Sequence, residues 1–345
     1  MNTSRTGEGA AGPFARLVGL LDTGRPVVIQ THDYPDIDAV ASAWALAELL
    51  RLRGFAASSV YRGEIRSRSL SRLIEELGIR IASFAPGSPA GASSQIITVD
   101  GSPANGNVSL VPGVLVGVVD HHCKSGEPAA PFADIQPDLA SCSALLYGYW
   151  EEAGENLGSD LATAILAGIQ SDTDFLSRRS SPEDFRAYSA LFSLGDWERS
   201  SRIVRTVLDL GELDRIARAL SSARIEGDML YATVEGPCEQ EALAVLADFA
   251  LRAEELRAAV AAGRDPAGVH FSVRSKSPAL SAFGLVRRAI AGIGSGGGHS
   301  HSAGGLVSAD AGLDDAAMRD RFFAAAAAMS TDWEAAVRSA NDNRP

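Results

Sequence analysis

The 345-residue sequence has few cysteines and no long apolar run, and each of these absences excludes a class of protein. Its three cysteines (Cys123, Cys142 and Cys238) are scattered and form no CxxC pair. They therefore offer no disulfide framework, and an odd set of this kind favours a reducing, cytoplasmic compartment. No stretch approaches the ~20 consecutive apolar residues that a membrane-spanning helix requires. We therefore expect a cytoplasmic protein without a membrane segment.

Positive charge is also scarce in this chain. The formal net charge is −12 at pH 7, and Lys124 and Lys276 are the only lysines. Proteins that bind long nucleic acids usually carry a basic stripe that contacts the phosphates. The acidic balance therefore argues against a long nucleic acid as partner. It is compatible with a small phosphorylated substrate whose charge is met locally by metal ions and a few arginines.

The length of the chain exceeds that of a typical single domain, so two domains are expected. The first residues are small and polar and lack the apolar core of a signal peptide, which predicts a disordered tail over residues 1–12. We expect a catalytic domain over residues 13–205, a helical linker over 206–222 and a smaller α/β substrate-binding domain over 223–345.

The first half of the sequence alternates short apolar segments with longer helical ones. Strands are expected at residues 26–31, 57–61, 95–100 and 114–120, and helices at 38–53, 67–77, 141–153, 161–171 and 184–194. This alternation indicates an α/β fold with a mostly parallel sheet. Functional side chains then gather at the carboxyl ends of the strands.

The second half begins after a connecting helix at residues 209–223. Strands are expected at 229–234, 269–274 and 306–308, and helices at 239–262, near 281–291 and from 314 onward. A glycine run precedes the strand at 306–308 and the helix from 314. Taken alone it could be a flexible turn, but beside the motifs of the first half a substrate contact is favoured.

Acidic and histidine side chains cluster at the predicted strand ends. His32, Asp36 and Asp38 lie within seven residues just after the first strand, and Pro35 keeps that loop extended. Taken alone, these aspartates are equally well explained as caps of the next helix.

Three further clusters favour a metal site over simple capping. Asp100 ends one strand, Asp120, His121 and His122 end the next, and Asp172 follows a helix. Carboxylate oxygens with some imidazole suit hard to borderline divalent ions such as Mn²⁺, Mg²⁺ or Co²⁺. The absence of thiolates from the clusters disfavours a structural zinc site.

The order of these motifs resembles that of the DHH superfamily of phosphoesterases. The residues that carry the resemblance are His32-x-x-x-Asp36-x-Asp38, Asp100, Asp120-His121-His122 and Gly168-Ile-x-x-Asp172-Thr173. In the second half, Gly296-Gly-Gly-His299 resembles the motif of the DHH-associated domain, and the resemblance covers nearly the whole chain.

The resemblance implies two adjacent divalent metal ions, with Mn²⁺ expected and Mg²⁺ or Co²⁺ as alternatives. One ion would be held by His32, Asp36 and Asp100, and the other by Asp38, Asp100, His121 and Asp172. Asp100 would bridge the two ions. Of the remaining two residues, which we assign to catalysis, His122 would face the substrate phosphate and Asp120 would orient its neighbours.

The resemblance also implies substrate contacts in the second half. Glycines allow backbone N–H groups to approach an anion or a base closely. Arg274 ends a strand and suits a bidentate contact with phosphate. The expected substrate-binding residues are Arg274, Ser275, Gly296, Gly297, Gly298 and His299.

Departures from the family pattern spare the six candidate ligands and concern residues beside them. Ile37 replaces the usual glycine between the two aspartates, and residues 174–179 add a carboxylate and two arginines beside the fourth motif. We expect a hydrolase of phosphoester bonds that acts on short oligonucleotides or 3′-phosphoadenosine 5′-phosphate, like the standalone two-domain oligoribonucleases (nanoRNases) of the family. A cyclic dinucleotide phosphodiesterase is the alternative enzyme, and a non-catalytic nucleotide-binding sensor is the alternative of another class. Assembly as a homodimer is left open.

Overall fold

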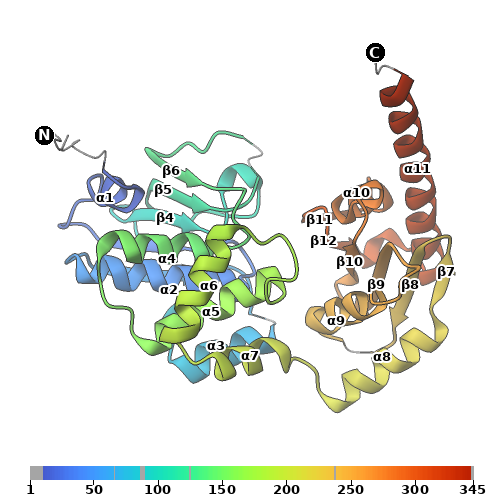
Figure 1. Cartoon of the computed structure of the whole chain (residues 1–345), viewed down its shortest axis with the longest axis horizontal. Helices are drawn as coiled ribbons and strands as arrows, with labels where there is room; N and C mark the ends of the chain where they lie inside the picture. Colours follow the sequence, from blue (N-terminus) through green and yellow to red (C-terminus); the bar gives the residue numbers. More distant parts are fainter. Residues whose placement is uncertain (1–10, 66, 86–89, 124–125, 237, 343–345) are drawn as a thin grey trace, which may run out of the picture. The chain divides into compact units, whose positions relative to one another are not determined.

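The computed structural model describes residues 11–65, 67–85, 90–123, 126–236 and 238–342 (Figure 1). Of the predicted tail, residues 1–10 lie outside the described residues. The chain divides into two compact units after Thr206. Among the described residues, no helix combines the length and the apolar character needed to cross a bilayer.

The first unit is built on a six-stranded sheet with the order β3-β2-β1-β4-β5-β6, in which all neighbouring strands are parallel. The strands are β1 (Val27–Gln30), β2 (Ala57–Tyr61), β3 (Ile81–Ser83), β4 (Gln95–Val99), β5 (Val114–Asp120) and β6 (Phe132–Ile135). This confirms the predicted α/β fold with a mostly parallel sheet. The central strands β1 and β4 are buried along their whole length, which explains their apolar sequences.

Helices cover mainly one face of this sheet, and Figure 1 shows α2 and α4 running side by side beneath it. The helices are α1 (Pro13–Val18), α2 (Ile37–Leu52), α3 (Arg68–Leu77), α4 (Cys142–Ala153), α5 (Ser159–Thr173), α6 (Pro182–Leu194) and α7 (Trp197–Arg205), with a 3₁₀ turn η1 (Pro103–Asn105). The main core lies between the sheet and α2, α4, α5 and α6, with Ile29, Leu46, Leu146 and Ile165 fully buried. Burial of this apolar face fixes the helices against the strand ends that carry the acidic residues.

The second unit holds a mixed six-stranded sheet with the order β11-β12-β10-β9-β8-β7. The strands are β7 (Arg224–Glu226), β8 (Met229–Val234), β9 (Ala258–Asp265), β10 (Gly268–Ser275), β11 (Gly294–Gly298) and β12 (Ser302–Ser308). The helices are α8 (Leu210–Ser222), α9 (Gln240–Ala250), α10 (Ala282–Ala289) and α11 (Asp315–Asp342), with 3₁₀ turns η2 (Pro278–Leu280) and η3 (Ala309–Ala311).

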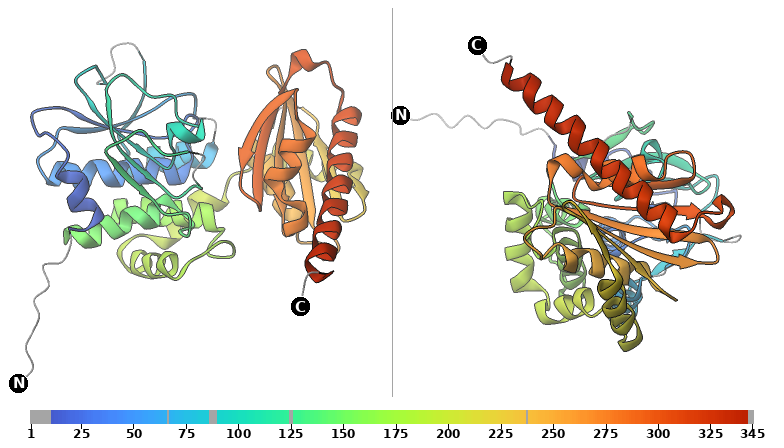
Figure 2. Two further views of the ribbon diagram at one scale, coloured as in Figure 1. Left: turned by 90° about the horizontal axis from the view of Figure 1, so that it is seen from above. Right: turned by 90° about the vertical axis from the view of Figure 1, so that its right-hand side faces the viewer.

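Helices pack on both faces of the second sheet. Helices α10 and α11 cover one face, where Phe271 and Phe322 are fully buried, and Figure 2 shows α11 lying along the sheet. Helices α8 and α9 cover the other face. The segment predicted as a linker thus contains α8, whose Ile216 and Ala219 are buried in this unit.

One prediction for the second unit is wrong. The helix expected over residues 239–262 ends at Ala250, and residues 258–265 form β9 instead. The alanine-rich sequence there favours a helix by intrinsic propensity, but it pairs with β8 and β10 on either side, and small side chains fit between the two helical layers. The glycine run, for which a flexible turn was the alternative to a substrate contact, forms the edge strand β11.

Candidate metal centre

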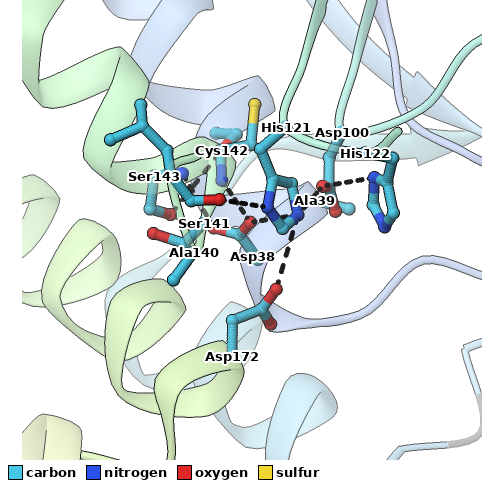
Figure 3. A network of polar contacts seen from close by, with 12 residues as sticks. Asp38, Ala39, Asp100, His121, His122, Ala140, Ser141, Cys142, Ser143 and Asp172 are labelled. Carbon is cyan, nitrogen blue, oxygen red and sulfur yellow. Dashed lines mark hydrogen bonds and ion pairs between the residues drawn. The ribbon is translucent and has the colours of Figure 1, made fainter. Parts of the chain in front are cut away.

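The candidate ligands converge because three neighbouring strands end at the same edge of the first sheet. Strands β1, β4 and β5 are adjacent, and the chain leaves them directly into His32, Asp100 and His121. The start of α2 adds two carboxylates and the end of α5 adds a third. Figure 3 shows the side chains from β4, β5, α2 and α5 pointing toward one another. The structure thus brings together all six residues that the resemblance assigned to metal binding.

Local backbone structure explains how two of these carboxylates are presented. Asp36 is the N-cap of α2, and its Oδ1 accepts a hydrogen bond from the N–H of Ala39 at 3.0 Å, so Asp36 rather than Asp38 caps this helix. Asp100 has a φ of 56°, in the left-handed region that residues other than glycine seldom adopt. Such conformations persist where the surrounding structure enforces them, often at functional sites.

The first group of potential ligands consists of His32, Asp36 and Asp100. His32 Nε2 lies 3.8 Å from Asp36 Oδ1 and 3.6 Å from Asp100 Oδ2. One ligand atom from each residue lies within 4.8 Å of the others.

The second group is centred on His121, whose side chain is completely buried. Its Nε2 lies 3.2 Å from Asp100 Oδ1, 3.6 Å from Asp172 Oδ2 and 3.9 Å from Asp38 Oδ2. Asp100 thus presents one oxygen to each group. This is the arrangement that a bridging carboxylate requires.

Crowding of negative charge perturbs the protonation of the site. Burial, reinforced by the charge of Asp100, raises the pKa of Asp38 to about 7. Burial and the neighbouring carboxylates also raise the pKa of Asp172. Burial opposes protonation of His121, but the carboxylates around it outweigh burial and raise its pKa to about 10.

The residues fit a divalent metal centre. Four carboxylates and two imidazoles meet at the ends of the three strands, and both Asp38 and Asp100 are buried. Carboxylates gathered so closely repel one another unless a cation lies between them. Oxygen ligands with some imidazole suit Mn²⁺, Mg²⁺ or Co²⁺.

Asp120 and His122 support this centre from one side. Asp120 Oδ1 accepts hydrogen bonds from the backbone N–H of His121 at 2.8 Å and of His122 at 3.1 Å, and it lies 2.7 Å from His122 Nδ1. Asp120 is therefore oriented toward the turn after β5. It fixes the ring of His122, which remains partly exposed beside Asp100.

The residues around the N-terminus of α4 also contact the centre, and the sequence did not single them out. The backbone N–H groups of Cys142 and Ser143 donate to Asp38 Oδ2 and Oδ1 at 2.7 and 2.8 Å. The carbonyl oxygen of Leu139 lies 3.3 Å from His121 Nδ1. Ser141 before an apolar helix was a detectable N-cap signal, but it predicts only where α4 begins.

The loop after Asp172 has an unusual backbone. Asp174, Phe175, Leu176 and Arg179 all have positive φ values between 46° and 64°. The guanidinium carbon of Arg205, at the end of α7, lies 3.8 Å from the centre of the Phe175 ring. Residues 174–179, which differ from the family pattern, thus include four residues with a left-handed backbone conformation beside the candidate ligand Asp172.

The predicted substrate-binding residues lie in the second unit. Gly296, Gly297 and Gly298 are exposed on the edge strand β11, and the rings of His299 and His301 stack at 5.6 Å between centroids. The other two predicted residues are already engaged by protein groups. Arg274 donates to Asp248 Oδ1 at 3.0 Å and to Ser272 Oγ at 3.1 Å, and the buried Ser275 hydroxyl donates to backbone carbonyls.

Comparison with known proteins agrees with this arrangement. An uncharacterized protein of Methanocaldococcus jannaschii is 28% identical over 283 residues, which cover 82% of this chain and 58% of the relative. A probable manganese-dependent inorganic pyrophosphatase of Streptococcus mutans is 28% identical over 149 residues, which cover 43% of this chain and 48% of the relative. The chain thus spans about half the length of the curated relatives it matches.

Two further matches concern the fold and the first unit. The crystal structure of an exopolyphosphatase-related protein from Bacteroides fragilis superposes with a TM-score of 0.70 at 17% identity, covering 88% of this chain and 94% of that one. Residues 26–169 match the family model described as the DHH family, N-terminal domain, and this range contains five of the six candidate ligands. The matched residues lie within the first unit, which is thus similar to the N-terminal domain of the DHH family.

Proposed function

We propose that this chain is a metal-dependent phosphoesterase that hydrolyses short oligonucleotides or 3′-phosphoadenosine 5′-phosphate and uses Mn²⁺. The observation that carries the proposal is the position of Asp100, whose Oδ2 faces His32 of one ligand group and whose Oδ1 faces His121 of the other. A shared carboxylate between two sites is the arrangement used to hold two ions close together at a reacting phosphate. The manganese-dependent relative in Streptococcus mutans supports the choice of ion.

Each residue has a defined part in this proposal. His32, Asp36 and Asp100 would hold one ion, and Asp38, Asp100, His121 and Asp172 would hold the other. When bound, two such ions lower the pKa of a shared water and stabilise in-line displacement at phosphorus.

His122 supplies the remaining chemistry from the protein side. Its ring is partly exposed beside the ligands, and Asp120 fixes its orientation through Nδ1. An imidazole held in this way can offset the charge that develops on the phosphoryl oxygens. Asp120 would act by positioning His122.

The second unit supports a small nucleotide as the substrate. Strand β11 lies at the edge of its sheet and consists mainly of exposed glycines, so its backbone can approach an anion closely. His299 and His301 offer parallel rings on which a base can stack. The free cysteines support a reducing cytoplasm as the compartment.

Inorganic pyrophosphate is a second candidate substrate, because the Streptococcus mutans relative is a probable pyrophosphatase. In the sequence, the second half carries Gly296-Gly-Gly-His299 in place of the lysine- and arginine-rich motif expected of a family II pyrophosphatase. We therefore rank this candidate below a nucleotide.

The test is a substrate panel with metal-stripped protein. Dinucleotides, a twenty-mer, 3′-phosphoadenosine 5′-phosphate, a cyclic dinucleotide and pyrophosphate are each incubated with Mn²⁺, with Mg²⁺ or with excess chelator. We expect hydrolysis with Mn²⁺, slower hydrolysis with Mg²⁺ and none with chelator, and faster cleavage of a dinucleotide than of the twenty-mer. Asp100→Ala serves as the inactive control.

Other outcomes would change the conclusion. Undiminished turnover after exhaustive chelation would contradict the metal mechanism. Equal rates on the dinucleotide and the twenty-mer would contradict the preference for short substrates. Tight nucleotide binding without hydrolysis under every metal condition would indicate a sensor instead of an enzyme.

A further inference from the structure

The segment of residues 139–143, which runs from the loop after β6 into the first turn of α4, contacts two candidate ligands at once. Its Leu139 carbonyl faces His121 Nδ1. Its last two backbone N–H groups, of Cys142 and Ser143, donate to the two oxygens of Asp38 (Figure 3). Asp38 and His121 belong to the same ligand group, the one completed by Asp172. Within the described residues, the polar contacts that we find for this segment reach neither His32 nor Asp36.

These contacts determine which atoms face the centre. A backbone carbonyl can only accept a hydrogen bond, so the contact with Leu139 favours a proton on His121 Nδ1. The lone pair of the neutral ring is then on Nε2, the atom that points toward the carboxylates. The two N–H groups at the start of α4 hold the Asp38 carboxylate in a fixed plane.

Asp184, in the first turn of α6, anchors this segment. Its side chain is completely buried, and both of its oxygens accept from the N–H of Ala140, at 3.2 Å for Oδ1 and 3.0 Å for Oδ2. Oδ2 also accepts from the backbone and the hydroxyl of Ser181, at 2.9 and 2.7 Å.

The contact with Ala140 is not needed to cap α6. The capping box of that helix is complete with Ser181 and Asp184 alone. Among the described residues, no cationic side chain forms an ion pair with Asp184, and a buried carboxylate without a counter-charge is costly. The carboxylate is thus held by three N–H or O–H donors, and one of them belongs to the segment that supports the ligands.

We propose that Asp184 is a positioning residue for one of the two metal sites, the site of Asp38, His121 and Asp172. The inference rests on the proposed two-metal function. Asp184 fixes Ala140, the segment 139–143 then holds Asp38 and His121, and the site of His32 and Asp36 does not depend on it. Loss of the contact between Asp184 and Ala140 should therefore lower the affinity for one of the two ions and leave the affinity for the other unchanged.

The test compares Asp184→Asn with Asp196→Asn in the full chain. Asn keeps the size of Asp184 but replaces one acceptor oxygen by a donor, which opposes the N–H of Ala140 or the donors of Ser181. Asp196 is a matched control because it caps α7 through the N–H of Arg199 and has no contact with residues 139–143. Stepwise Mn²⁺ binding is measured by calorimetry, and unfolding is measured with chelator present.

We expect Asp184→Asn to bind one Mn²⁺ like the wild type and the other ten- to a hundredfold more weakly, as is typical when a group that orients a ligand is removed. Asp196→Asn should bind both ions normally. The double variant with Asp36→Ala identifies the affected ion. Asp36→Ala weakens binding at the site of His32, so Asp184→Asn should then lower the affinity for the one ion that still binds. If Asp184→Asn fails to fold, Asp184→Glu, which keeps the charge and displaces the oxygens, is measured in the same way.

Two results would overturn the inference alone. In the first, Asp184→Asn binds both ions with wild-type affinity. In the second, both affinities fall equally and in proportion to the loss of stability without metal, which is a general structural effect. If the wild type itself binds fewer than two ions, the proposed function fails, and the inference fails with it.

Discussion

Gly168 of α5 lies against the carboxylate of Asp38, so that a Cβ atom at position 168 would stand 2.8 Å from Asp38 Oδ1 and 2.1 Å from Ser143 Oγ. A residue without a side chain is therefore required for α5 to approach α2 and α4 this closely. Asp172 lies one helical turn further along α5, on the same side, and the close approach brings it within reach of His121.

We expect Gly168→Ala to reduce Mn²⁺ binding at the site of Asp38 and to lower stability by about 1–3 kcal/mol through overpacking. Gly148→Ala is the matched control, because a Cβ at position 148 of α4 meets no atom within 4 Å. That control should gain about 0.5–1 kcal/mol, since alanine favours a helix over glycine. Chemical denaturation and metal titration measure both effects, and equal behaviour of the two variants would contradict the steric role of Gly168.

Asp100 should matter more than any ligand that belongs to one group. Because its two oxygens face different groups, Asp100→Ala should lower the affinity for both ions, whereas Asp36→Ala should lower the affinity for one. Elemental analysis of protein equilibrated at limiting Mn²⁺ provides the comparison. Full retention of two ions in Asp100→Ala would exclude a bridging role.

Metal binding should release protons, and the number should depend on pH. The pKa of Asp38 is about 7 and that of His121 about 10 without metal, so both carry protons at pH 6, whereas at pH 8.5 Asp38 is ionised. Ions bind the deprotonated forms, so affinity should fall as pH drops below 7, and proton release should be larger at pH 6 than at pH 8.5. Titrations in buffers of different ionisation enthalpy measure this release.

An Asp38→Asn variant provides the control for that experiment. It should lose the part of the pH dependence that belongs to Asp38 and keep the part that belongs to His121. Proton release that is the same at pH 6 and 8.5 in the wild type would show that Asp38 is already ionised throughout this range.

His299 and Arg274 of the second unit should respond differently to truncation. His299→Ala should lower turnover of a nucleotide roughly ten- to a hundredfold, the usual cost of a lost charge-assisted contact of ~1.5–3 kcal/mol, and should spare bis-p-nitrophenyl phosphate, which lacks a distal group. Arg274 binds Asp248 and Ser272, so Arg274→Ala should also destabilise the second unit. Assays with both substrates and thermal unfolding separate the two roles. An equal loss of activity on both substrates in His299→Ala would place that residue in the catalytic centre.

The ligands could be predicted from the sequence because each one lies at or beside a recognisable element end. His32, Asp100 and His121 come directly after apolar strands, and a parallel sheet brings such ends to one edge. Asp172 lies in the last turn of α5, whose motif resembles the family pattern. In these places, local pattern and chemistry point to the same function.

Residues that act through packing could not be predicted in this way. Asp184 is the N3 residue of the capping box of α6, and its sequence context indicates only the start of that helix. Its contact with Ala140, 44 residues earlier, depends on how α6 packs beside α4. Strand β9 was missed for a related reason, because pairing with two neighbouring strands overrode the helical propensity of its alanines.

The bonds between Asp38 and the start of α4 also bear on how the first unit folds. They join residues 104 and 105 positions apart, and such distant contacts form late because a long loop must close first. A growing chain therefore cannot assemble this ligand group until α4 and α5 have been synthesised and have packed against the sheet. An ion at this ligand group would thus bind only after these elements have packed, and it would stabilise the first unit from that point on.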